Sequence, residues 1–137
     1  MNGTTGVSMD KSAVNKGIIL IIDDEVTFVQ AAILALELEG YTVLKAHDGV
    51  QGLVVFNQHR HLISLVLCDL NMPHQDGDST IQKILALQPS LKVIVMSGSI
   101  DDENLPNIIH HPSCLYLQKP FSVQTLIENV EKMIKQE

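Results

Sequence analysis

Two short apolar runs in this 137-residue chain are each followed at once by aspartate. Residues 18–22 (IILII) precede Asp23 and Asp24, and residues 65–68 (LVLC) precede Asp69. A continuous apolar run of this length is typical of a β-strand that is covered on both faces, as in a parallel sheet between helices. The two runs therefore favour a layered fold in which carboxylates lie at the ends of buried strands.

Strands and helices alternate along the rest of the chain. Further strands are predicted at residues 41–47, 92–99 and 114–121. Apolar residues between the strands recur at helical spacing, which predicts four helices with one apolar face each. The residues expected to face the core are Val29, Ala32, Ile33 and Leu36 in the first helix and Val50, Leu53 and Val54 in the second. In the third they are Ile81, Ile84 and Leu85, and in the last Val123, Leu126, Ile127, Val130 and Ile134. Two prolines interrupt residues 100–113, which predicts a short or distorted helix there.

Polar residues and glycine mark the expected helix ends. Gly40 is expected to end the first helix, Asp78 or Ser79 to cap the third, and Ser122 to cap the last. Five strands that alternate with five helical segments predict an α/β fold. The sheet should be parallel, with helices on both of its faces.

Composition and charge predict a small globular protein with a single domain. The polar, glycine-bearing residues 1–16 predict a flexible tail ahead of a domain at 17–137. A formal net charge of −7 argues against partners such as nucleic acid or an anionic membrane. Cys68 and Cys114 lie in apolar contexts, and no apolar run could span a bilayer. These features predict a cytoplasmic protein, with Cys68 filling the core.

Five polar residues are expected along one edge of the sheet, because the carboxyl ends of parallel strands meet there. They are Asp23, Asp24, Asp69, Ser97 and Lys119. Two carboxylates 4 Å apart repel by about 4 kcal/mol at an effective dielectric near 20, so the cluster needs a cation or a proton. Carboxylate oxygens suit Mg²⁺, while a lysine and a hydroxyl suit phosphoryl oxygens. Asp69 is then a candidate nucleophile for phosphoryl transfer.

Four motifs spread over residues 17–137 resemble those of the response-regulator receiver domains of two-component signalling systems. They are LIIDDE (20–25), LCDLNMPHQDG (67–77), VIVMSGS (93–99) and LQKPF (117–121). The resemblance implies the CheY-like, flavodoxin-like fold with strand order 2-1-3-4-5. It also implies a phosphoacceptor for a histidine kinase or a histidine phosphotransfer protein.

The resemblance assigns metal and phosphoryl roles to individual residues. Asp69 would accept the phosphoryl group, and Asp24 would bind Mg²⁺, or Mn²⁺ in its place, directly. Asp23 would act mostly through water, and the backbone carbonyl of Asn71 would complete the protein ligands. Lys119 would pair with the phosphoryl group or, at rest, with Asp69.

The resemblance also implies a conformational switch. Ser97 would move toward the phosphoryl oxygens, and Tyr116 would turn inward, although Tyr116 also fits a core aromatic with a surface hydroxyl. The bond between Lys119 and Pro120 is expected to be cis. Gly98 either leaves the site open to a small phosphodonor or only forms a turn. Ser99, with Asn71, would flank the path of hydrolytic water.

Three functions remain open at this stage. The first is a phosphorylation-controlled module that acts on an unknown protein target and catalyses only its own phosphorylation and dephosphorylation. It could act as a single domain, as a phosphorelay intermediate, or as part of a hybrid histidine kinase. The second is a small phosphatase, for which Asn71 stands where a general acid is needed. The third is a degenerate receiver that only binds partners. The six histidines are expected at the surface, without a metal.

Overall fold

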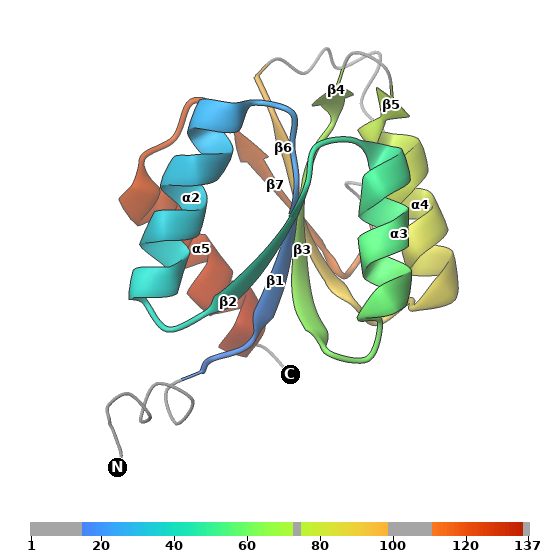
Figure 1. The fold of residues 1–137 in the computed structure, drawn as a ribbon, viewed down its shortest axis with the longest axis horizontal. Helices are drawn as coiled ribbons and strands as arrows, with labels where there is room; N and C mark the ends of the chain where they lie inside the picture. Colours follow the sequence, from blue (N-terminus) through green and yellow to red (C-terminus); the bar gives the residue numbers. More distant parts are fainter. Residues whose placement is uncertain (1–14, 73–74, 99–110, 136–137) are drawn as a thin grey trace.

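The structure, a computed structural model, describes residues 15–72, 75–98 and 111–135. It contains a five-stranded parallel sheet of β1 (Ile18–Ile22), β2 (Thr42–Ala46), β3 (Ile63–Asp69), β6 (Lys92–Ser97) and β7 (Cys114–Gln118), shown in Figure 1. The strand order β2-β1-β3-β6-β7 confirms the predicted order 2-1-3-4-5. The first fourteen residues of the predicted tail, and most of the predicted helix at 100–113, lie outside the described residues.

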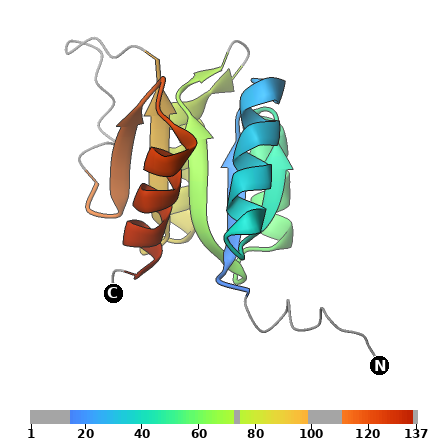
Figure 2. The same ribbon diagram turned by 90° about the vertical axis from the view of Figure 1, so that its left-hand side faces the viewer.

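Helices cover both faces of the sheet, as predicted. α2 (Val26–Leu38) and α5 (Val123–Lys135) lie on one face, and α3 (Gly49–Gln58) and α4 (Gly77–Leu87) on the other (Figures 1 and 2). Side chains along each strand alternate between two buried clusters. In β1, Ile19 and Ile21 pack with α2 and α5, whereas Leu20 and Ile22 pack on the other side. β1 is apolar throughout because both of its faces are covered.

The predicted inner face of α3 is wrong in part. Val50 and Val54 are 61% and 52% exposed, while Gly52 and Phe56 face the sheet and Leu53 is half-buried. A Cβ on Gly52 would lie 2.6 Å from Cδ1 of Ile22, so α3 approaches β1 closely at this glycine. This close approach turns the two valines outward.

Predicted helix ends and faces elsewhere are partly confirmed. Gly40 has a positive φ of 106° after α2, and Ser122 Oγ accepts a hydrogen bond of 3.0 Å from the Thr125 backbone N–H. The other predicted inward residues of α2, α4 and α5 are buried or half-buried, apart from Val123, which is exposed. α5 buries Met133, which the prediction omitted. α4 starts at Gly77, so the predicted cap at Asp78 or Ser79 is wrong, because both residues lie in its first turn.

A short antiparallel pair, β4 (Asn71–Met72) and β5 (Gln75–Asp76), lies between β3 and α4. It was not predicted, and it places Asn71 at the carboxyl end of the sheet beside Asp69. Lys16, assigned by prediction to the tail, donates its backbone N–H to Gly40 and pairs with Glu131 at 3.0 Å. Among the described residues, no helix is both long and apolar enough to cross a membrane.

Candidate phosphorylation and metal site

Three carboxylates meet at the carboxyl end of the sheet. Asp23 follows β1 and Asp69 ends β3, and these two strands are neighbours in the sheet. Each of Asp23, Asp24 and Asp69 offers a carboxylate oxygen within 4.8 Å of those of the other two. Asp23 and Asp69 are only 1% and 4% exposed, and Asp24 is the more accessible. The predicted convergence of these side chains is therefore present in the structure.

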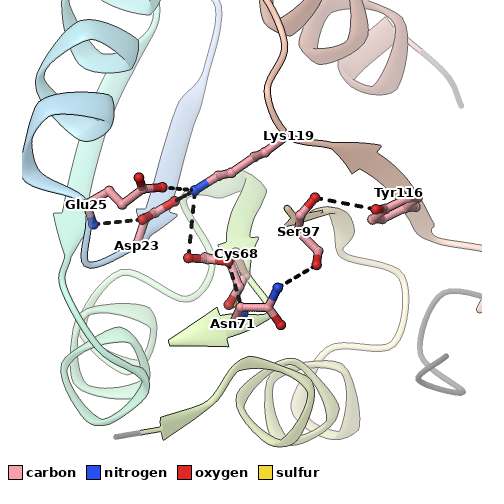
Figure 3. Close-up of polar contacts among 8 residues, drawn as sticks. Asp23, Glu25, Cys68, Asn71, Ser97, Tyr116 and Lys119 are labelled. Carbon is pink, nitrogen blue, oxygen red and sulfur yellow. Dashed lines mark hydrogen bonds and ion pairs between the residues drawn. The ribbon is translucent and has the colours of Figure 1, made fainter. Parts of the chain in front are cut away.

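Lys119 supplies the positive charge of the cluster. It follows β7, and its bond to Pro120 is cis, as predicted. Its Nζ lies 2.9 Å from Asp23 Oδ2 and 2.5 Å from Glu25 Oε1, but 3.7 Å from Asp69 Oδ2. Figure 3 shows the amine directed at Asp23 and Glu25. The predicted pairing with Asp69 is thus present, but it is the longest of the three.

Two residues of this site were missed by the sequence prediction. Glu25 is the third acid of the run that follows β1, and this position could have predicted its place in the site. It forms the shortest ion pair with Lys119. Phe28 lies one turn into α2, and its ring centroid is 4.6 Å from Lys119 Nζ. Phe121 packs edge-on against Phe28 at 5.6 Å. The lysine is therefore held between carboxylates and an aromatic wall.

Burial and hydrogen bonding shift the pKa values of Asp23 and Lys119. Burial raises the pKa of Asp23, and the hydrogen bonds from the Glu25 backbone and from Lys119 only partly offset this effect. Burial lowers the pKa of Lys119, but its hydrogen bonds to Glu25 and Asp23 outweigh burial, so that the pKa is raised. Lys119 is therefore a cation throughout the neutral range.

Asn71 joins the phosphoacceptor candidate to the predicted switch residues. Its backbone N–H donates to Asp69 Oδ1 at 3.0 Å, and its side-chain Nδ2 donates to Ser97 Oγ at 2.7 Å. The Tyr116 hydroxyl donates to the Ser97 carbonyl at 3.4 Å, and the Tyr116 ring is half-buried against the core. Burial raises the pKa of Tyr116. Figure 3 shows this chain of contacts from Asn71 through Ser97 to Tyr116.

An open pocket of about 600 Å³ gives access to the cluster. Its lining includes Asp24, Asp69, Gly98 and Lys119. A Cβ on Gly98 would meet no atom of the described residues within 4 Å. Ser99, the other residue predicted to control access, lies outside the described residues.

Comparison with known proteins decides the family. The model of the response regulator receiver domain matches residues 19–131. The chain belongs to this family. The receiver is 29% identical over 87% of its length to the sensor kinase CckA of Brucella abortus, and 30% identical over 85% to the transcriptional regulatory protein ZraR of Salmonella typhimurium. It spans only 13% and 26% of the length of these two relatives.

Solved receiver structures share the fold. The receiver domain of the hybrid histidine kinase CckA is 28% identical, with a TM-score of 0.75 over 87% of this chain and all of that one. A response regulator receiver domain protein from Clostridium thermocellum is 31% identical, with a TM-score of 0.78 over 86% of this chain and 94% of that one. The predicted family and fold are both confirmed.

The donor set of the receiver fits a hard divalent cation. Three carboxylate oxygens lie close together, and among the described residues Lys119 is the one cation paired with them. Mg²⁺ binds carboxylates and keeps several waters, which the open side of the pocket at Asp24 allows. Asp23, Asp24 and Asp69 are therefore the residues that would hold it.

Replacement of Asp23 by asparagine is expected to stabilise the metal-free receiver at neutral pH. Because burial raises the pKa of Asp23, the folded state keeps its proton to a higher pH than the unfolded state does. The stability that this proton provides is complete below about pH 4, which is the pKa of an aspartate in the unfolded chain. It is lost as the pH rises through the pKa of Asp23 in the folded state. Urea unfolding in EDTA from about pH 4 to pH 7 should show Asp23→Asn gaining on the wild type as pH rises.

A matched control is Glu37→Gln, which removes one exposed carboxylate from α2. This variant measures what the loss of one surface carboxylate away from the site does to stability over the same pH range. If the stability gained by Asp23→Asn over the wild type shrank as pH rises, the raised pKa of Asp23 would be contradicted.

Proposed function

We propose that the receiver accepts a phosphoryl group on Asp69 from a phosphohistidine of a histidine kinase or histidine phosphotransfer protein, with Mg²⁺ required. The observation that carries this proposal is the convergence of three carboxylates and Lys119 beside an open pocket, whose lining includes Asp24, Asp69 and Lys119. Family membership supports it. Phosphorylation would then change a surface that binds a target protein.

The chemistry asked of Asp69 is an in-line attack. One carboxylate oxygen forms a bond to phosphorus while the bond from phosphorus to the donor imidazole nitrogen breaks, and the imidazole leaves with the electron pair. The Asn71 backbone N–H holds Asp69 Oδ1 and so fixes the orientation of the carboxylate. Lys119 lies 3.7 Å from the other oxygen, where it can stabilise charge on the phosphoryl oxygens. A bound Mg²⁺ supplies further neutralisation of that charge.

Mg²⁺ affinity tests the metal part of the proposal. Asp24→Asn is expected to weaken Mg²⁺ binding by about tenfold or more, because even residues behind a ligand commonly contribute that much. Isothermal titration calorimetry with MgCl₂ measures the change, and Glu37→Gln serves as the charge-matched control. An unchanged affinity in Asp24→Asn would remove this residue from the ligand set.

The same site also bears on the phosphatase alternative. A phosphatase with an aspartyl nucleophile needs a general acid beside it, and Asn71 cannot donate a proton as an acid does. The Asn71 side chain is moreover hydrogen-bonded to Ser97. We therefore propose that the receiver is not a phosphatase that acts on phosphomonoesters. Steady release of p-nitrophenol from p-nitrophenyl phosphate at an ordinary enzymatic rate, on the order of 1 s⁻¹ or faster, would contradict this.

The phosphodonor class is part of the proposal, whereas the target protein is left out of it. The relatives include a sensor kinase and a transcriptional regulatory protein, which place similar domains in very different chains. A phosphorelay role, as in a hybrid kinase, is therefore the second candidate. Transfer of the phosphoryl group from Asp69 onward to a histidine phosphotransfer protein would favour it.

A further inference from the structure

We propose that Asn71 restrains the switch hydroxyl in the unphosphorylated receiver, so that phosphorylation must break a specific side-chain bond. The inference rests on the proposed function of Asp69. It starts from the contact between Asn71 Nδ2 and Ser97 Oγ, which at 2.7 Å is the shortest of the contacts described for Ser97. Ser97 is 1% exposed and Asn71 is exposed, so the bond is part-buried and its hydroxyl end is shielded from water.

The position of Asn71 links the phosphoacceptor Asp69 to the switch residue Ser97. Its backbone N–H holds Asp69 Oδ1 at 3.0 Å, while its side chain holds the Ser97 hydroxyl. One residue therefore contacts both the phosphoacceptor and the switch. A phosphoryl group on Asp69 adds strong acceptors beside Asn71, and a hydroxyl that turns toward them leaves the amide.

The far side of Ser97 is held as well. The Ser97 carbonyl accepts the Lys119 backbone N–H at 2.8 Å and the Tyr116 hydroxyl at 3.4 Å. The backbone of Ser97 is thus held to β7 in the unphosphorylated state, which favours rotation of the side chain as the way the hydroxyl moves. The Asn71 amide is therefore a latch on that rotation, and Asn71 acts as a positioning residue.

Beryllofluoride with Mg²⁺, which mimics a phosphoryl group on a carboxylate, measures the latch at equilibrium. Asn71→Ala is expected to bind beryllofluoride about fivefold more tightly than the wild type, since one net hydrogen bond no longer has to be broken. In a Ser97→Ala background the same substitution should change nothing. The control Asn129→Ala removes an amide that bonds only locally within α5, to the Thr125 carbonyl, and should leave the affinity unchanged.

A second measurement does not depend on phosphorylation. In urea unfolding of metal-free protein, Asn71→Ala and Ser97→Ala should cost less together than the sum of their separate costs, because either one alone removes the shared bond. Additive costs, or weaker beryllofluoride binding by Asn71→Ala, would overturn the latch while leaving the proposed function intact. No beryllofluoride binding by the wild type would overturn the proposed function, and the latch with it.

Discussion

Gly77→Ala is expected to destabilise the receiver by about 3 kcal/mol and to displace Asp69, which makes it the most damaging small substitution at the site. A Cβ at this position would overlap the carbonyl oxygen of Asp69 and approach Cα of Leu70. Both are backbone atoms of the segment that positions the phosphoacceptor, so a rotamer change cannot relieve the contact. Urea unfolding measures the loss of stability.

Two other glycines give matched controls for this effect. The nearest atoms to a Cβ in Gly52→Ala all belong to the side chain of Ile22 and none to the backbone, so this variant should cost less, about 1 kcal/mol. Gly98→Ala meets none of the described atoms within 4 Å and should be nearly neutral for stability. Equal losses in all three variants would show that backbone overlap at Gly77 is not the cause.

Lys119→Met is expected to slow phosphorylation of Asp69 on the order of 10²-fold, the usual loss when one preorganised charge donor is removed from a reacting site. The methionine keeps most of the length of the side chain, but it leaves Asp23 and Asp69 without the cation and removes the amine that lies over the Phe28 ring. Initial rates of phosphorylation by acetyl phosphate measure the effect. Lys83→Met, at an exposed position on α4, is the control.

The same variant should reveal the electrostatic role of Lys119 in folding. Without it the buried carboxylates repel each other, so Lys119→Met should be less stable than the wild type in EDTA. Saturating Mg²⁺ should recover much of that difference, because a cation that binds only the folded state stabilises it. A deficit that Mg²⁺ leaves unchanged would show that packing, and not charge, is what the substitution removes.

The edge of the sheet that carries the site was predictable, because the alternation of strands and helices along the chain sets the direction of the strands. Apolar runs that end on Asp23 and Asp69, with helices between them, leave right-handed parallel connections as the ordinary solution. Those connections bring both aspartates to one edge of the sheet, as observed. The same argument placed Ser97 and Lys119 at this edge, whereas the cis bond before Pro120 followed from the family resemblance.

Side-chain partners and helix faces could not be predicted so well. Lys119 lies closer to Asp23 and Glu25 than to Asp69, and that preference depends on where helix α2 begins relative to β7. In α3 the apolar residues surround the helix, so periodicity alone cannot choose a face. The choice is made by Gly52, whose missing side chain admits Ile22. Asn71 was assigned a role through its backbone, whereas its side-chain bond to Ser97 accompanies the pairing of β4 with β5, which the sequence did not reveal.

The central claim is that Asp69 is the acceptor, and intact-mass spectrometry tests it most directly. The wild type, incubated with acetyl phosphate and Mg²⁺, should gain the mass of one phosphoryl group, and the adduct should be lost on brief treatment with alkali. Asp69→Asn, and wild type in EDTA, should gain none. A single adduct that persists in Asp69→Asn would place the phosphoryl group elsewhere and contradict the assignment.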